Sequence, residues 1–296
     1  MTGQSTSQSI TAAAAGQAPA STGRRARLGL IRGGRPLKRW RYVGVFNEEL
    51  MACAAIVQVG PARQSFWALY LREQDELRER TRLLPRRRAL RLLRGSRLGA
   101  EDRRPGRLLV SDGGVVIDLS LEEDDGFAAR CANGRAHVWT RKQAGIAAHG
   151  MLALDGRAPR PIEALAVIDD TAGYHERVTE WWWSAGVGQS PDGAALAWNL
   201  VEGVNDPPLG SERAVWIDGE AREAPPVQFS QNLARIACVD GSALRFHAEA
   251  ERSHNANMII IKSDYRAPFG AFSGVLPGGV ALAHGLGVVE HHRAVW

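Results

Sequence analysis

The chain has 296 residues, 45% of them hydrophobic and 23% charged, which is the composition of a globular protein and not of a disordered one. Its three cysteines, Cys53, Cys131 and Cys238, are widely spaced and form no CxxC pair. That pattern argues against a disulfide scaffold and a structural zinc site, and it favours a reducing, cytoplasmic location. We identify no secretion signal, and no apolar run reaches the roughly 18–20 residues of a membrane-spanning helix.

The net charge of +5 comes from two segments of the chain. Residues 1–41 contain eight basic side chains and no acidic one, and residues 81–97 contain seven arginines and no acidic residue. One interpretation of residues 81–97 is a peripheral contact with an anionic membrane, and the other is a solvated arginine face. Nucleic-acid binding is not expected, because no recognisable binding module accompanies the basic residues.

The first third of the chain predicts a tail, a strand meander and one helix. Residues 1–30 are rich in Ser, Ala, Gln and Gly without apolar periodicity, which predicts a disordered tail. Three apolar runs between residues 36 and 71, punctuated by turn residues, predict a meander. Residues 72–83 are the best helix candidate, and residues 86–99 fit a basic amphipathic helix or a pair of strands equally well.

From residue 107 onward the pattern is that of a mainly β protein. Short segments of alternating apolar and polar residues follow one another, separated by Gly, Asn and Asp, as in a sandwich or barrel. The stretch RAPRP at residues 157–161 interrupts this pattern. We therefore expect one β domain over residues 31–160 and a second over residues 161–296.

The most chemically suggestive segment is DDTAGYHERVTEWWWSAGVG, residues 169–188. If it forms a strand, Trp181 and Trp183 share one face and Trp182 takes the other. One face would pack in the core and the other would line a cavity; alternatively, two packed sheets need large residues on both faces. A carboxyl group beside tryptophan rings is desolvated, so its pKa rises and it can donate a proton near neutral pH. The Asp169–Asp170 pair could supply that group or could simply cap a turn.

Two further segments hold polar candidates. Residues 198–208 (WNLVEGVNDPP) contain Asn199, Glu202 and Asn205, and Glu202 would need a partner if its strand turned it inward. In the C-terminal segment, Glu290 and His292 share a strand face and could form an acid–base pair, whereas the adjacent His291 points the other way. This spacing does not predict a metal site, and no GxGxxG or Walker pattern predicts a nucleotide cofactor.

Five blocks carry a resemblance to a known family, in this order from about Gly34 to Trp296. They are GRPLKRWRYVGVF, HVWTRKQAG, AGYHERVTEWWWSAGVG, AWNLVEGVNDPP with ERAVWIDG, and SDYRAPFGAFSGVLPGG with GVVEHH. They resemble a bacterial domain-of-unknown-function family. That family is similar to the lipocalin-like superfamily of hydroxyneurosporene synthase (a carotenoid hydratase), tocopherol cyclase and fungal Diels–Alderases.

The resemblance implies an all-β fold of two lipocalin-like antiparallel barrels with few short helices and a ligand cavity at or near their junction. It also implies a hydrophobic small-molecule ligand and no redox cofactor. Tyr174 to Trp183 is similar to the superfamily's histidine–tryptophan strand, and Gly287 to Glu290 to its C-terminal glycine-to-glutamate strand. The hydratases have Asp directly before the histidine, where this chain has Tyr174 before His175, so the resemblance leaves the proton donor open.

These observations predict a cofactor-independent hydratase, cyclase or isomerase acting on an apolar, isoprenoid- or polyketide-like substrate. The predicted catalytic residues are Asp170 or Glu202 as the acid, with His175 and Glu290 as orienting or base partners. The predicted substrate-binding residues are Tyr174, Trp181, Trp183, Asn199, Asn205 and His292. The alternatives are a non-catalytic lipid- or isoprenoid-binding protein and an interaction protein whose apolar surface is a dimer face.

Overall fold

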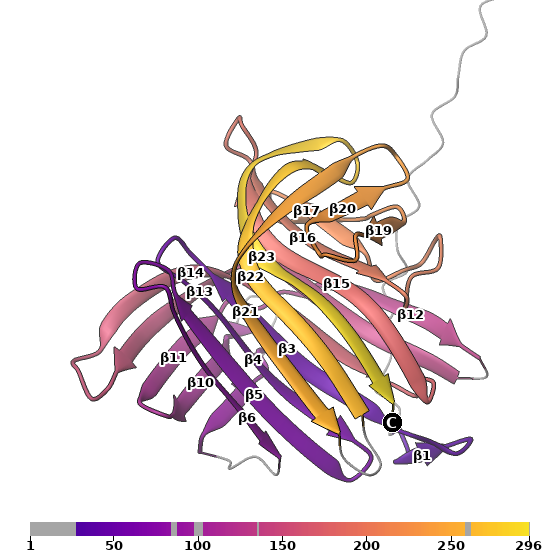
Figure 1. The fold of residues 1–296 in the computed structure, drawn as a ribbon, viewed down its shortest axis with the longest axis horizontal. Coiled ribbons are helices and arrows are strands. Elements are labelled where there is room, and N and C mark those ends of the chain that lie inside the picture. Colours follow the sequence, from indigo (N-terminus) through magenta and orange to yellow (C-terminus); the bar gives the residue numbers. More distant parts are fainter. Residues whose placement is uncertain (1–27, 84–87, 98–102, 135, 258–261, 296) are drawn as a thin grey trace, which may run out of the picture.

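The computed structural model describes residues 28–83, 88–97, 103–134, 136–257 and 262–295 (Figure 1). The predicted disordered tail, residues 1–30, lies almost wholly outside these residues. The described part of the chain consists of strands and turns and contains no helix. The prediction of an all-β fold is therefore confirmed, and the few short helices expected with it are not found in the described ranges.

The first sheet has the strand order β6-β5-β4-β3-β14-β13-β11-β10-β7, with β12 paired to β13, and all of its pairs are antiparallel. Its strands are β3 (Lys38–Phe46), β4 (Leu50–Val59), β5 (Ala62–Leu71), β6 (Glu76–Leu83), β7 (Leu90–Leu93), β10 (Gly106–Asp112), β11 (Val115–Leu121), β12 (Phe127–Asn133), β13 (Ala136–Leu154) and β14 (Arg160–Gly173).

The second sheet has the order β18-β17-β16-β15-β23-β22-β21-β20-β19 and is also antiparallel. Its strands are β15 (Val178–Gln189), β16 (Ala195–Glu202), β17 (Ala214–Ile217), β18 (Glu220–Glu223), β19 (Val227–Phe229), β20 (Arg235–Cys238), β21 (Ala243–Asn257), β22 (Lys262–Leu276) and β23 (Val280–Val295). Two small ribbons pair β1 (Ile31–Arg32) with β2 (Arg35–Pro36), and β8 (Ser96–Arg97) with β9 (Arg103–Arg104).

The chain passes from the first sheet to the second between Gly173 and Val178. The sequence placed the domain boundary between residues 160 and 161 instead. The RAPRP stretch there belongs to the connection between β13 and β14, which pair with each other along their length. Proline and glycine occur in turns inside a sheet as readily as in linkers between domains. The interrupted pattern therefore placed the boundary before β14, whereas the chain changes sheets after β14.

The helix expected over residues 72–83 is wrong, because this segment forms a turn and the edge strand β6. β6 pairs with β5 from Glu76 opposite Leu71 to Leu83 opposite Gln64. The turn before it holds Asp75 at a φ of 49°, a left-handed conformation that Asp tolerates. Charged residues suit an exposed sheet edge, and the pairing with β5 outweighs the helical preference of the local sequence.

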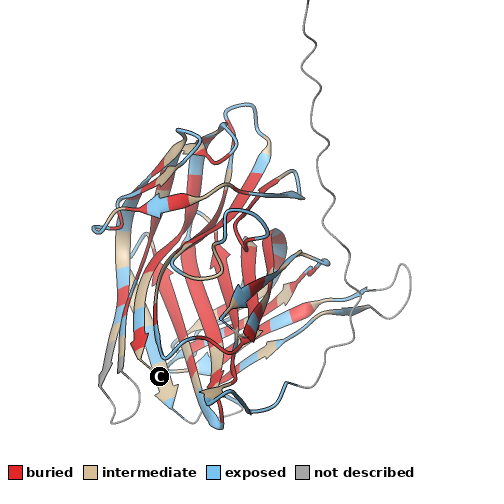
Figure 2. Ribbon diagram, turned by 90° about the vertical axis from the view of Figure 1, so that its right-hand side faces the viewer, coloured by how far each residue is buried: buried red, intermediate tan, exposed pale blue. Residues whose placement is uncertain are grey.

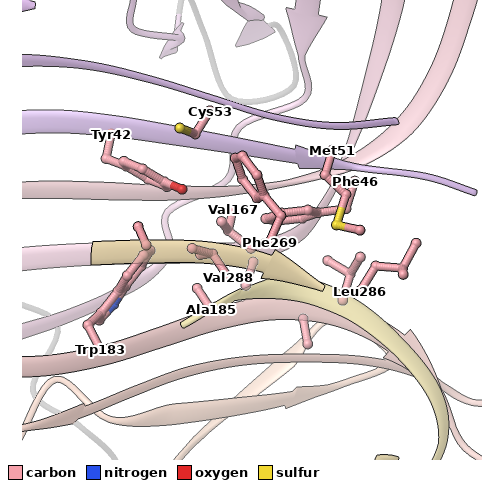
Figure 3. Close-up of a cluster of buried hydrophobic side chains, with 14 of the residues drawn as sticks. Tyr42, Phe46, Met51, Cys53, Val167, Trp183, Ala185, Phe269, Leu286 and Val288 are labelled. Carbon is pink, nitrogen blue, oxygen red and sulfur yellow. The ribbon is translucent and has the colours of Figure 1, made fainter. Parts of the chain in front are cut away.

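Three large hydrophobic clusters and a small fourth one make up the core, and Figure 2 shows buried residues along the strands of both sheets. Of the three large clusters, one lies within the first sheet, one within the second, and the third lies between the two sheets; we call this third one the junction cluster. Because neighbouring residues of a strand point to opposite sides, β3 contributes Val43 and Val45 to the first sheet's own core and Tyr42 and Phe46 to the junction cluster. Figure 3 shows the junction cluster, with side chains from both sheets meeting in one layer.

Glycines on β15 and β23 make room for Trp198 in the core of the second sheet. A Cβ atom on Gly186 would lie 2.3 Å from Cζ2 of the Trp198 ring and 2.6 Å from the carbonyl oxygen of Leu286. We expect Gly186→Ala to lower the free energy of unfolding by about 3 kcal/mol through overpacking, measured by chemical denaturation. Gly29→Ala, whose Cβ would meet nothing closer than 3.6 Å, should change it by less than about 0.5 kcal/mol.

Candidate functional site

The three consecutive tryptophans of β15 alternate between two faces, as predicted. Trp181 and Trp183 face the first sheet and contact the junction cluster, whereas Trp182 packs in the core of the second sheet and stacks on His291 at 4.6 Å. The buried Trp183 meets the Tyr42 ring edge-on at 5.2 Å, and its Nε1 donates to Asn199 Oδ1 at 2.8 Å. Asn199, which was predicted to bind substrate, instead fixes the orientation of the Trp183 ring.

Glu290 lies on β23 directly opposite Trp183, with its side chain in the same layer. The residue is only 9% exposed, and Trp181 Nε1 donates a 2.8 Å hydrogen bond to its Oε1. Burial raises the pKa of Glu290 to about 7, and the hydrogen bonds from Trp181 and Tyr265 offset only part of that rise. The sequence named Asp170 or Glu202 as the desolvated acid and Glu290 as an orienting or base partner; in the structure the carboxyl group beside Trp181 and Trp183 is that of Glu290.

His292 shares the face of Glu290, as the strand pattern predicted. Its Nδ1 lies 4.0 Å from Glu290 Oε1, which is too long for a hydrogen bond, and its Nε2 is 2.8 Å from the Ser263 hydroxyl. The ring packs against Trp181 with centroids 4.3 Å apart. Burial lowers the pKa of His292 to about 3, so the imidazole is neutral and forms part of the wall around Glu290.

Four buried residues around Glu290 were not singled out in the sequence: Tyr42, Cys53, Arg252 and Tyr265. Arg252 is 2% exposed, with its guanidinium 4.0 Å above the centre of the Phe66 ring. The four residues come from four strands: Tyr42 from β3, Cys53 from β4, Arg252 from β21 and Tyr265 from β22. Strand alternation could have placed each on one of two faces, but only the pairing of the two sheets shows that these faces meet.

A buried ion network lies beside this group at the junction. Lys142 Nζ is 2.8 Å from Asp169 Oδ2 and 3.1 Å from Glu212 Oε1. Burial alone would lower the pKa of Lys142, but the two carboxylates raise it above its ordinary value; burial in turn raises the pKa of Glu212. Trp40 Nε1 donates to Asp169, and Asn205 Nδ2 donates to Glu212, both at 2.9 Å. Asn205 thus belongs to an ionic link between the two sheets.

His175 lies on the connection between the sheets, buried against Trp40 with ring centroids 5.3 Å apart. Burial lowers its pKa to about 3, with a further contribution from the nearby charges of Lys38 and Lys142. Its Nε2 has no hydrogen-bond partner among the described residues. A neutral imidazole of such low basicity is a poor general base, and its contact is with Trp40 and the ion network.

Asp170 is not an acid donor, contrary to the prediction. It is 0% exposed and points to the other face of β14, into the core side of the first sheet, away from Asp169. Arg41 and Arg141 donate to its Oδ2 at 2.8 and 2.9 Å, and Arg94 lies 2.5 Å from its Oδ1. Three guanidinium groups therefore surround this carboxyl, and none of the three tryptophans of β15 is among its partners.

Glu202 and Tyr174 also lie outside the site around Glu290. Glu202 pairs with Trp182 and points with it to the opposite face of the second sheet, where its Oε2 accepts from the backbone N–H of Phe229 at 2.7 Å. Tyr174 packs beside Leu37, and its hydroxyl donates to the Gly29 carbonyl at 2.7 Å. Glu202 lies on the other face because side chains alternate along β16, whereas Tyr174 lies in the connection between β14 and β15 and not in a strand.

Other features of the described residues bear on the remaining predictions. A surface hollow of about 550 Å³, lined by residues such as Arg235, Asp240 and Arg245, includes none of the predicted site residues. At the junction, where the sequence predicted a ligand cavity, buried side chains fill the layer between the sheets. In the arginine-rich segment, Arg82 and Arg94 form ion pairs with Asp112 and Asp170, while residues 84–87 lie outside the described ranges. The described chain contains no cluster of three potential metal ligands, and none of it forms a helix with the length and apolarity of a membrane span.

Comparison with known proteins supports the fold and places the chain in a family. No curated protein matches it. An AttH-like protein from Nitrosomonas europaea has a similar structure, with 13% identity and a TM-score of 0.55 over 93% of this chain and 98% of that one. Kievitone hydratase from Nectria haematococca is similar at 11% identity and a TM-score of 0.53, over 87% and 89% of the two chains.

These two likenesses extend over both sheets and confirm the expected architecture of two packed lipocalin-like units. The family comparison covers all of the second sheet and the later strands of the first, including Glu290, Trp181 and Lys142. Residues 109–296 match a family described as a domain of unknown function, and the chain therefore belongs to the DUF2804 family.

Proposed function

We propose that this protein is a cofactor-independent hydratase, cyclase or isomerase that acts on an apolar, isoprenoid- or polyketide-like substrate, with Glu290 as its proton donor. The observation that carries the proposal is a carboxyl group buried between two sheets, with its pKa raised to about 7. Such a group is protonated in a substantial fraction of molecules at neutral pH and can transfer that proton without a cofactor. Kievitone hydratase, whose name denotes a reaction of this class, shares the fold with this protein; the similarity supports the proposal by fold only.

The chemistry begins with one proton transfer. The π electrons of a substrate C=C bond form a C–H bond with the Glu290 proton, which leaves a carboxylate on the protein and a cationic centre on the substrate. Trp181, whose N–H donates to Glu290, would supply an aromatic ring that stabilises this centre by cation–π attraction. In a hydratase, water then adds and its surplus proton returns to Glu290. In a cyclase, a second C=C bond closes a ring and moves the cationic centre, and a C–H bond next to that new centre then loses its proton to Glu290. In an isomerase, a C–H bond next to the first cationic centre loses its proton to Glu290 directly.

Substrate access is through the margin of the junction, where Trp181 and His292 are only partly buried. Side chains fill this layer in the structure, so a bound molecule has to displace some of them; the layer holds small residues, among them Ala55, Ala185 and Ala267, beside its aromatic ones. A carrier protein without chemistry would use the same layer. The two functions differ in whether a proton reaches substrate carbon.

The test is to purify the protein from its own host, identify any bound apolar compound by native mass spectrometry and organic extraction, and incubate that compound with the protein in D2O. Deuterium should enter the product at carbon. Glu290→Gln, which can still accept from Trp181, should slow this incorporation at least about 100-fold. Glu202→Gln, on the other face of the second sheet, is the matched control and should incorporate deuterium at the wild-type rate.

Two results would contradict the proposal. A bound compound that acquires no deuterium with the wild-type protein would identify a carrier. Unchanged incorporation by Glu290→Gln would show that another group donates the proton.

A further inference from the structure

The hydroxyl group of Tyr42 is buried at the junction without a strong hydrogen-bond partner. Tyr42 is 6% exposed, and its hydroxyl has no nitrogen or oxygen partner among the described residues. Figure 3 shows its ring projecting from β3 into the layer between the sheets, with the oxygen directed into the cluster. In the described part of the chain, the one group that interacts with it by hydrogen bonding is the Cys53 thiol, which is a weak hydrogen-bonding group compared with a nitrogen or oxygen partner.

An orphan hydroxyl in this position is unusual. Buried side-chain polar groups nearly always form hydrogen bonds, because an unmade bond leaves the cost of desolvation uncompensated. The hydroxyl groups nearby are satisfied by contrast: Tyr265 interacts by hydrogen bonding with Glu290 and Arg252, and Thr81 accepts from Arg252 at 2.8 Å. The group left over is a donor, since burial raises the pKa of Tyr42 well above its ordinary value.

The orphan hydroxyl shares its surroundings with the proposed proton donor. The Tyr42 ring contacts Trp183, which pairs with Glu290 across β15 and β23, and Tyr42 and Tyr265 belong to the same buried cluster as that tryptophan. An unpartnered donor beside a protonatable carboxyl forms a two-point site in an otherwise apolar layer. One point can deliver a proton, and the other can hold an oxygen atom.

We infer that Tyr42 donates a hydrogen bond to an oxygen atom of the ligand, so that the ligand is an apolar molecule carrying a carbonyl or other acceptor oxygen and not a pure hydrocarbon. The inference deepens the proposed function by naming a substrate class for the same site. In that role Tyr42 is a binding and positioning residue: the fixed oxygen sets which carbon atoms of the ligand lie near Glu290.

The binding test uses two chain-like probes of similar size, farnesal, which carries an aldehyde oxygen, and farnesene, which has none. Dissociation constants come from tryptophan fluorescence, because Trp183 lies against Tyr42. We expect the wild-type protein to bind farnesal about tenfold more tightly than farnesene. Tyr42→Phe should bind both with similar affinity and should keep the wild-type affinity for farnesene.

The stability test needs no ligand. Removing an unpartnered buried hydroxyl should leave the melting temperature of Tyr42→Phe unchanged or raise it, because the fold loses an unsatisfied polar group. Tyr265→Phe is the matched control, since its hydroxyl is engaged with Glu290 and Arg252, and it should lower the melting temperature.

Two binding results would overturn the inference: a wild-type protein that binds both probes equally or neither of them, and a preference for farnesal that persists in Tyr42→Phe. In the stability test, a melting temperature of Tyr42→Phe as low as that of Tyr265→Phe would also overturn it. These outcomes are separate from those for Glu290. If Glu290→Gln still transferred protons, the proposed catalyst would be wrong, and the role of Tyr42 in oxygen recognition would still be measured by the probe pair.

Discussion

Replacing Lys142 with methionine is expected to lower the free energy of unfolding by about 3–5 kcal/mol. Lys142 is 1% exposed and lies between the carboxylates of Asp169 and Glu212. Without the ammonium group, two buried carboxylates at the junction repel one another. The donors that remain are neutral: Trp40 and Thr171 at Asp169, and Asn205 at Glu212. Urea denaturation at neutral pH measures the loss.

A neutral network provides the control for this prediction. In the triple variant Lys142→Met, Asp169→Asn, Glu212→Gln, the carboxylates are removed together with the lysine, while the oxygen acceptors for Trp40 and Asn205 remain. We expect this variant to recover most of the stability lost in the single variant, because the cost arises from unpaired charge and not from lost packing. A single variant that lost less than about 1 kcal/mol would show that the two carboxylates are not held as a buried pair.

The second large effect is a dependence of stability on pH that disappears in Glu290→Gln. The pKa of Glu290 is raised from 4.5 to about 7 in the folded protein, so the fold favours the protonated carboxyl. Between these two values the folded state binds a proton that the unfolded state has released, and stability therefore falls as the pH rises. Above pH 7 the full difference, about 3 kcal/mol, separates the wild type from the variant.

The measurement is the free energy of unfolding of both proteins from pH 4 to pH 8. His175 and His292, with pKa values lowered to about 3, weaken the fold as the pH falls, and they do so in both proteins, so the difference between the curves isolates Glu290. The free energy of unfolding of Glu290→Gln should increase steadily relative to that of the wild type as the pH rises from about 4.5 through 7. Parallel curves would mean that the carboxyl is not desolvated in the folded protein.

The opposite outcomes for Asp170 and Glu290 show where reasoning from the sequence reached its limit. Asp170 was a candidate acid because it precedes the three tryptophans, and Glu290 was a candidate orienting or base partner because it shares a strand face with His292. Asp170 meets three arginines from separate parts of the first sheet, whereas Glu290 meets an indole N–H and a layer of aromatic rings. The charge state of a carboxyl depends on such neighbours, and these partners come from positions remote in the chain.

The sequence by itself determined the strand content and the alternation of faces, because side chains of a strand point to its two sides with a period of two. It placed Trp181 with Trp183, Glu290 with His292, and Trp182 and His291 opposite them. Only the tertiary structure decided which face of each strand meets the other sheet. Tyr42 and Tyr265 lie more than 200 positions apart in the sequence, and a local pattern carries no information about which distant strands will pack together.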